Sequence, residues 1–408
     1  MKGFLNNVGY LYLLQGVSYF LPLVTMPYLI ITLGLENYGR VTLAIAVANY
    51  VTIAVDFGFN LSAVLAISKL RNDLKKTEIV FWSIIYAKLI FAGLVLIVTF
   101  IGIYWELFAW LDYYFGLAVL LMVLGNIMMP VWFFQGIEEM KQVAVSGVIN
   151  KIIFSVLIFS CVNRSTDFWF VAIFQGIGGI CGGIYAFYII LSRMHLGIGI
   201  PAFFEIRNQI KCAVPYFFSR IAVSFYTSAN LLVLGAFATT YETGYYAVVE
   251  KVYNGLQGVY GPIVQAIYPL VAYTKKLDSF RRVFRVVILI NTISLLIGIY
   301  FAPNIVMVFT KVYIADASIC LRLLLVACFF VAPSVLIGYP VLGTFGHQDA
   351  VNRSAMIGAA IYSVLVIGMI SKGEVNAGYI SGTVLVVEVC VFIFRIAMVK
   401  GLKFEILS

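Results

Sequence analysis

Residues 29–50 read LIITLGLENYGRVTLAIAVANY, which is two apolar runs separated by a short polar turn that contains Glu36 and Gly39. This pattern is typical of a hairpin in which each run continues as a long apolar helix. A similar arrangement recurs at residues 231–254, LLVLGAFATTYETGYYAVVEKVYN, with a Leu-Gly pair followed by Glu242 and Gly244. We infer that the chain is built from two similar halves.

The composition requires a lipid environment for most of the chain. Of its 408 residues, 63% are hydrophobic and 11% are charged, and the mean hydropathy is +1.03. A soluble domain carries about 25% charged residues. Because lipid offers no partners to free backbone groups, we predict an all-α polytopic membrane protein of about twelve transmembrane helices. The predicted spans are 5–32, 41–68, 79–103, 114–135, 142–162, 168–191, 211–237, 244–272, 283–303, 318–344, 353–371 and 377–399.

The spans divide into two groups of six near the middle of the chain. We predict an N-terminal six-helix bundle at residues 1–191, a cytoplasmic linker at 192–210 and a C-terminal six-helix bundle at 211–408. Because each half has an even number of spans, the halves are related by a pseudo-two-fold axis along the membrane normal. Two facing bundles with a cleft between them are the usual arrangement of a transporter.

The net charge of +9 follows the membrane topology and does not indicate nucleic-acid binding. If the N-terminus is inside, 18 of the 27 basic residues fall in cytoplasmic segments. The outer segments hold only four of them, Arg40, Arg164, Lys311 and Lys372. This asymmetry obeys the positive-inside rule and predicts that both termini are cytoplasmic.

Several ionisable residues lie inside predicted spans, where they are costly and indicate function. They are Asp56, Lys88, Lys151, Arg220, Glu250, Lys251, Arg322 and Glu388. Three of the cations, Lys88, Lys151 and Arg220, lie at one depth. Each is about nine residues into its span, which is about 13 Å from the cytoplasmic face at 1.5 Å per helical residue. A ring of cations facing a cleft would attract a phosphate-bearing headgroup. The candidate substrate-binding residues are Lys88, Lys151, Arg220, Lys251 and Arg322. The alternative is that these long side chains reach the membrane interface.

The intramembrane acids suggest a second role. Asp56 and Glu250 are candidates for binding a coupling ion, H⁺ or Na⁺. The alternative, favoured for Asp56, is that the acid neutralises a buried cation. The six cysteines lie in or at the ends of spans, with no spacing typical of a metal site or a disulfide framework, so we expect no metal and no cofactor apart from the coupling ion.

The stretch PVWFFQGIEEMK at residues 130–141 joins three aromatic residues to two adjacent acids. Trp132, Phe133 and Phe134 stand where aromatic residues anchor a helix at the membrane interface, and Gly136 would allow the turn that follows. Their acidic neighbours then begin a short cytoplasmic link, which argues against a catalytic carboxylate pair. These acids are instead candidates for a cytoplasmic gate with basic residues of the other half. The gate candidates are Glu138, Glu139, Arg281, Arg282 and Arg353.

Three segments together resemble one transporter family. They are LPLVTMPYLIITLGLENYG (21–39), VDFGFNLSAVLAISKLRND (55–73) and PVWFFQGIEEMK (130–141). They resemble the O-antigen flippases, the polysaccharide-transporter branch of the multidrug, oligosaccharidyl-lipid and polysaccharide exporter superfamily. The resemblance covers the whole chain in size, span number and division into halves.

The resemblance implies a multi-pass protein of the bacterial inner membrane. Such a protein moves an undecaprenyl-diphosphate-linked oligosaccharide from the cytoplasmic to the periplasmic leaflet by alternating access, driven by an ion gradient. It also implies the O-antigen polymerase and the chain-length regulator as partners, besides the membrane lipid. The resemblance transfers no catalytic residue to this chain.

Three other functions compete with this interpretation. A lipid-linked peptidoglycan-precursor flippase fits the charge equally well, and only the motifs speak against it. A multidrug exporter would place buried acids in its cavity, whereas here the intramembrane cations outnumber the acids. A membrane polymerase or acyltransferase usually needs a large loop or a buried histidine, but His195 and His347 fall in cytoplasmic loops.

Overall fold

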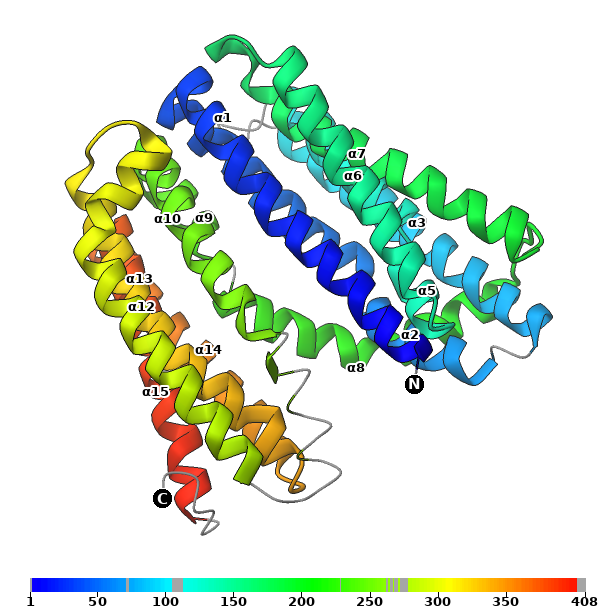
Figure 1. The fold of residues 1–408 in the computed structure, drawn as a ribbon. Helices are drawn as coiled ribbons and strands as arrows, with labels where there is room; N and C mark the ends of the chain where they lie inside the picture. Colours follow the sequence, from blue (N-terminus) through cyan, green and yellow to red (C-terminus); the bar gives the residue numbers. More distant parts are fainter. Residues whose placement is uncertain are drawn as a thin grey trace. The chain divides into compact units, whose positions relative to one another are not determined.

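A computed structural model describes residues 2–70, 73–104, 113–227, 229–261, 263–264, 267, 271 and 278–401. Within these ranges the regular structure is helical, and no β-strand occurs. The chain divides into two compact units, Met1–Ile221 and Ala222–Ser408 (Figure 1). The division lies inside helix α8 (Phe203–Thr227), beyond the predicted linker at 192–210.

The N-terminal unit is a bundle of long helices that follow one another along the chain. Its elements are α1 (Lys2–Asp56), α2 (Phe59–Leu70), α3 (Leu74–Tyr104), α4 (Tyr113–Met128), α5 (Val131–Gly136), α6 (Met140–Cys161), the short helix η1 (Ser165–Asp167), α7 (Phe168–Tyr188), the π-helical turn η2 (Ile189–Arg193) and most of α8. Helix α7 packs against both α4 and α6, and α1 packs against α4 and α6 in turn.

Glycines on two faces of α7 allow this packing. A methyl group added at Gly176 would lie 2.6 Å from the backbone of Leu121 in α4, so this face needs a residue without a side chain. On the other face, a methyl group at Gly178 would lie 2.6 Å from the carbonyl oxygen of Asn150 in α6. Small residues that let helix backbones approach closely are a common interface in membrane bundles.

The aromatic stretch that follows α4 belongs to the core and not to the membrane interface. The exposed fractions of Trp132, Phe133 and Phe134 in α5 are 0%, 1% and 1%, and the rings of Trp132 and Phe133 pack against Phe81 of α3. The prediction that these aromatic residues anchor a helix at the membrane interface is therefore wrong, because α5 packs against α2 and its rings contact α3. The tight turn also differs, since the left-handed residue is Glu138, with φ 65°.

Gly136 has a packing role that the sequence did not reveal. A methyl group at this position would lie 2.7 Å from Ile67, so the glycine lets α5 approach α2 closely.

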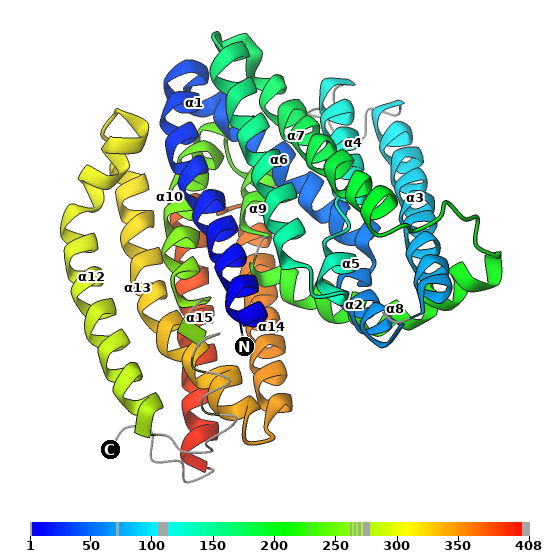
Figure 2. The same cartoon turned by 45° about the vertical axis from the view of Figure 1, so that its right-hand side comes forward.

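The C-terminal unit is built around α13. Its elements are α9 (Asn230–Phe237), α10 (Thr240–Gly258), α12 (Asp278–Thr310), α13 (Ala315–Ile337), the π-helical turn η3 (Gly338–Gly343), α14 (Gln348–Lys372) and α15 (Ala377–Gly401). Helix α13 packs against α10, α12 and α15, and α14 packs against α15. Figures 1 and 2 show α12 and α13 running side by side.

The two turns of the sequence repeat break the helices at equivalent positions. Gly39 and Gly244 are 205 residues apart, and so are Gly34 and Thr239. Gly34 interrupts α1 with φ 78° and ψ 161°, which a residue with a side chain rarely adopts. Thr239 begins α10 in extended geometry, and its side-chain oxygen accepts a hydrogen bond of 3.2 Å from the backbone N–H of Glu242. In both copies of the repeat, the regular helix is therefore interrupted at the corresponding residue, Gly34 or Thr239.

Among the described residues, nine helices are long and apolar enough to cross a membrane. Eight of them coincide with predicted spans. The ninth, Gly16–Asp56, overlaps parts of both 5–32 and 41–68, because the helix resumes directly after Gly34, and the rest of 41–68 lies in α2. The predicted spans 211–237 and 244–272 have no such helix, since α8 and α10 carry several charged residues and 244–272 includes residues outside the described ranges. The chain is a multi-pass membrane protein.

Candidate functional site

A buried ion pair lies in the N-terminal unit where α1 ends. The Nζ atom of Lys88, in the middle of α3, lies 2.6 Å from Oδ1 of Asp56, and 1% of the lysine side chain is exposed. The second oxygen of Asp56, Oδ2, accepts a hydrogen bond of 2.8 Å from the side-chain nitrogen of Asn60. Removing a charge from water is costly unless it is paired, so each member of this pair compensates the other.

A left-handed turn places Asp56 at this point. Phe57 and Gly58 have φ values of 42° and 79°, which end α1 and allow α2 to start in a new direction. The ring of Phe57 stacks between those of Phe91 in α3 and Phe217 in α8, with centroid distances of 4.6 and 4.3 Å. The turn therefore packs between α3 and α8.

The structure places the other predicted cations in different surroundings. Lys151 in α6 is half-buried and Arg220 in α8 is exposed, and both belong to the N-terminal unit with Lys88. Lys251 in α10 is half-buried. Arg322 in α13 is exposed, and its Nε donates a hydrogen bond of 3.3 Å to the carbonyl oxygen of Ile299 in α12. Of the predicted site residues, Asp56 and Lys88 form an ion pair.

The C-terminal unit contains a polar chain that ends at Glu250. The side-chain nitrogen of Asn230 in α9 donates to Glu250 Oε1 at 3.2 Å, and the hydroxyl of Tyr362 in α14 donates to Asn230 Oδ1 at 2.9 Å. One turn before Glu250, the buried hydroxyl of Tyr246 has no hydrogen-bond partner among the described residues. Three helices thus converge on one carboxylate.

Sequence reasoning missed Asn230 and Tyr362. Both side chains are neutral, so neither has the charge that marks a functional residue inside an apolar span. A buried asparagine in an apolar span is the signal that could have found the cluster, because a polar group in lipid also needs a partner.

The gate candidates lie at element ends and on exposed faces. Glu138 and Glu139 occupy the exposed turn between α5 and α6 in the N-terminal unit. Arg281 and Arg282 lie near the start of α12, and Arg353 lies exposed near the start of α14, all in the C-terminal unit.

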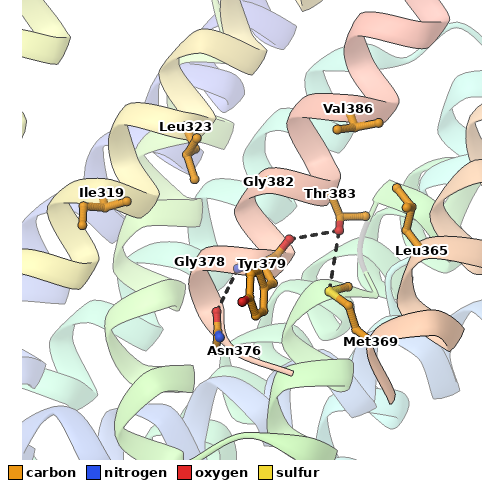
Figure 3. A pocket seen from close by; sticks show the side chains of 10 residues that line it. All are labelled: Ile319, Leu323, Leu365, Met369, Asn376, Gly378, Tyr379, Gly382, Thr383 and Val386. Atoms are coloured by element: carbon orange, nitrogen blue, oxygen red, sulfur yellow. Dashed lines mark hydrogen bonds between the residues drawn. The ribbon is translucent and has the colours of Figure 1, made fainter. Parts of the chain in front are cut away.

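Two cavities in the C-terminal unit have mainly apolar walls. One, of about 510 Å³, lies between α13, α14 and α15 (Figure 3). Its polar residues are bonded within the chain: Asn376 Oδ1 accepts from the backbone N–H of Tyr379 at 2.8 Å, and the Thr383 hydroxyl donates to the Tyr379 carbonyl oxygen at 2.9 Å. The other, of about 470 Å³, lies between α10, α12 and α13. Such walls suit acyl chains better than ionic groups.

A third cavity, in the N-terminal unit, has a different character. It measures about 270 Å³ and lies among α1, α2, α4, α6 and α7. More than half of its lining residues are uncharged and polar, and most of these are asparagine or glutamine. It is close to the ion pair, because Asn60 both lines the cavity and donates to Asp56.

Solved structures share the fold. A structure of the lipid II flippase MurJ in an inward closed conformation aligns with a TM-score of 0.76 and 12% identity, over 97% of this chain and 87% of that one. An inward-facing multidrug resistance MATE family transporter of the MOP superfamily aligns with a TM-score of 0.68 and 14% identity, over 95% of each chain. These alignments define the class, a multi-pass helical membrane protein with the fold of these transporters, and confirm the predicted fold class.

The sequence comparisons define the family. Residues 4–275 match the family described as "Polysaccharide biosynthesis protein". A protein of Escherichia coli (strain K12) named "Putative O-antigen transporter" is 28% identical over 372 residues, which is 89% of this chain and 88% of the relative. A protein of Shigella dysenteriae with the same name is 27% identical over 65% of this chain and 66% of the relative. The chain belongs to the polysaccharide biosynthesis protein family, and the prediction of a transporter rather than an enzyme is confirmed.

Proposed function

We propose that this protein moves a lipid-linked oligosaccharide, carried on undecaprenyl diphosphate, from the cytoplasmic to the periplasmic leaflet of a bacterial inner membrane. The observation that carries the proposal is the match, over 89% of this chain, to the protein named "Putative O-antigen transporter", together with the family match. The fold supports a transport function, because a lipid II flippase and a multidrug resistance transporter share this fold over most of the chain.

The proposed mechanism is alternating access by the two units, with the lipid tail left in the bilayer. The diphosphate would be attracted by cations inside the spans. We assign this role to Lys151, Arg220, Lys251 and Arg322. Lys88, the fifth predicted cation, is already neutralised by Asp56, so its contribution would be to hold that part of the unit in place.

Glu250 is the proposed site of the coupling ion, H⁺ or Na⁺. Its carboxylate is fixed by Asn230, which is fixed in turn by Tyr362, so a bound ion would influence three helices at once. Asp56 is the weaker candidate, since its two oxygens already engage Lys88 and Asn60.

The proposed orientation has both termini in the cytoplasm. In that orientation Glu138 and Glu139 would form the cytoplasmic gate with Arg281, Arg282 or Arg353 when the cleft is open to the outside. A polymerase and a chain-length regulator of the same pathway are the proposed protein partners, because they would act on the product that this transporter delivers.

Purified protein in liposomes provides the test. The probe is undecaprenyl diphosphate carrying a fluorescent oligosaccharide, and movement is read as loss of accessibility to an impermeant quencher outside. Parallel samples carry a lipid-linked peptidoglycan precursor or a cationic drug, which separates the three transporter functions. We expect movement of the oligosaccharide lipid with an unaltered sugar chain. Absence of movement, or a lengthened or acylated product, would overturn the proposal.

A further inference from the structure

The amide-lined cavity of the N-terminal unit has the features of a ligand site. Of its eleven lining residues, six are uncharged and polar and come from α1, α2, α4, α6 and α7. They are Asn49, Thr52, Asn60, Asn126, Asn150 and Gln175. All of them lie within one compact unit, so the cavity does not depend on how the two units are placed.

Most of these polar groups are available to a ligand. Within the described ranges, the side chains of Asn49, Asn126 and Gln175 make no hydrogen bond to another residue. The amide nitrogen of Asn150 contacts only the sulfur of Met129, at 3.7 Å, and thioether sulfur is a weak acceptor. Each side-chain amide offers two donor hydrogens and one acceptor oxygen. The cavity therefore presents several donors and acceptors that the protein itself does not use.

The uncharged, polar lining of the cavity is a poor match for two parts of the proposed substrate, the diphosphate and the isoprenoid tail. No charged residue is among the described residues that line it, so it does not match a diphosphate. The nearby charges of Asp56 and Lys88 neutralise each other. An isoprenoid tail is also a poor match, because it would leave the amides without partners. An uncharged group rich in hydroxyls is a good match, since a hydroxyl both donates and accepts, as an amide does.

The volume of the cavity and its apolar lining residues further limit the kinds of ligand that would fit. At about 270 Å³ the cavity is just below the roughly 300–1,000 Å³ of sites that enclose drug-sized molecules. It would hold one ring and not a whole oligosaccharide. Met122, Met129 and Val131 supply apolar surface for the C–H face of such a ring.

We propose that this cavity binds one uncharged sugar ring of the transported saccharide. The assignment of the ligand as part of the transported molecule rests on the proposed function. In this arrangement the N-terminal unit recognises the sugar, and the intramembrane cations serve the diphosphate.

The proposal also gives the Asp56–Lys88 pair a role. Asn60 donates one N–H to Asp56, which fixes the orientation of its amide and leaves its other N–H and its carbonyl oxygen for the cavity. Lys88 in turn holds Asp56 at 2.6 Å. The two charged residues are thus positioning residues for the cavity wall.

Binding of free sugars to the purified full chain tests the proposal. Saturation-transfer difference NMR is recorded with methyl glycosides of a neutral hexose, an N-acetylhexosamine and a 6-deoxyhexose, and with a methyl glucuronide as the charged comparison. Asn126→Leu and Gln175→Leu replace amides by apolar groups of similar size, and Thr52→Val is a smaller change. The matched control is Asn304→Leu, the same replacement at an exposed position of α12 in the other unit.

We expect a signal from at least one neutral glycoside and a weaker one from the glucuronide. Each cavity variant should weaken binding about tenfold, the effect of losing one hydrogen bond, while Asn304→Leu binds as the unaltered chain. Thermal unfolding of each variant shows that it is folded. The proposal is overturned if no neutral glycoside gives a signal, or if the folded cavity variants bind as well as the control.

The liposome assay separates this proposal from the proposed function. If lipid-linked oligosaccharide moves but the cavity variants move it at the normal rate, the sugar site is wrong and the function stands. If glycosides bind in the expected pattern but no lipid-linked saccharide moves, the sugar site stands and the proposed function fails.

Discussion

The ammonium group of Lys88 lies 2.6 Å from the carboxylate oxygen Oδ1 of Asp56, inside the N-terminal unit. Because 1% of the lysine side chain is exposed, solvent does little to screen either charge. The charge of Lys88, which was predicted to bind the substrate, is therefore neutralised by Asp56. The pair also joins the end of α1 to α3, directly before the left-handed turn at Phe57 and Gly58.

Breaking the pair should destabilise the protein more than removing it. Asp56→Asn or Lys88→Met leaves one buried charge without its partner, at an expected cost of about 3–5 kcal/mol in the free energy of unfolding. The double variant leaves no charge, so most of the loss should be recovered. Unfolding in detergent, followed by fluorescence-detected size exclusion, measures the differences.

An exposed pair in the same unit provides the control. Lys76 and Asp73 are 3.0 Å apart, but their side chains are 67% and 43% exposed. Lys76→Met should therefore cost at most about 1 kcal/mol. Single variants of the buried pair that are as stable as Lys76→Met, or a double variant no better than the singles, would contradict the prediction.

Gly58 should not tolerate a side chain. Its φ of 79° is unfavourable for alanine by about 1–2 kcal/mol. A methyl group there would also lie 2.7 Å from the backbone nitrogen of Phe217. Gly58→Ala should therefore lower both the unfolding temperature and the amount of protein in the membrane, because α8 must move away.

Two other glycines separate the causes of this loss. Gly373 has φ 68° but no neighbour within 4 Å, so Gly373→Ala should show the backbone cost alone. Gly93 lies in α3 with no neighbour within 4 Å, so Gly93→Ala should be neutral or stabilising by up to about 1 kcal/mol. Equal unfolding temperatures for the variants at positions 58 and 373 would show that the contact with Phe217 is unimportant.

The sequence predicted the features that depend on regular patterns. Span positions follow from runs of apolar residues, as in the eight helices that coincide with predicted spans. The repeat was visible because Gly39 and Gly244 occupy corresponding places in two hairpins. These signals are local, so no knowledge of the packing was needed.

The features that depend on helix rotation and tertiary packing were not predicted. Depth along a span put Lys88 among the candidate cations, but which residue it faces depends on the turn at Phe57. Trp132 was placed at the membrane interface because aromatic residues often lie there, whereas a six-residue helix carries it into the core. Asn230 escaped notice because a neutral side chain reveals its importance only through its partners.

Glu250 should matter for coupling more than for folding. In Glu250→Gln an amide oxygen can still accept from Asn230, so the protein should fold, but the side chain can no longer hold an ion by its charge. We expect at least about a tenfold loss of gradient-driven transport, with little change in the unfolding temperature. Transport into liposomes with an imposed H⁺ or Na⁺ gradient measures the loss and identifies the ion.

The matched control for this change is Glu374→Gln, which removes a carboxylate from an exposed turn of the same unit. It should transport at the normal rate with either gradient. If Glu250→Gln keeps the full response to both gradients, the coupling site lies elsewhere in the chain.

Two natural cysteines can establish the orientation of the chain. Cys161 is exposed at the last residue of α6, next to the exposed Asn163 and Arg164, and Cys212 is exposed in α8, beside Lys211. With both termini in the cytoplasm, Cys161 faces the periplasm and Cys212 the cytoplasm. In single-cysteine variants, an impermeant maleimide should label Cys161 in intact spheroplasts, and Cys212 only after the membrane is permeabilised. The reverse pattern would place the termini outside and would also reverse the assignment of the Glu138 gate.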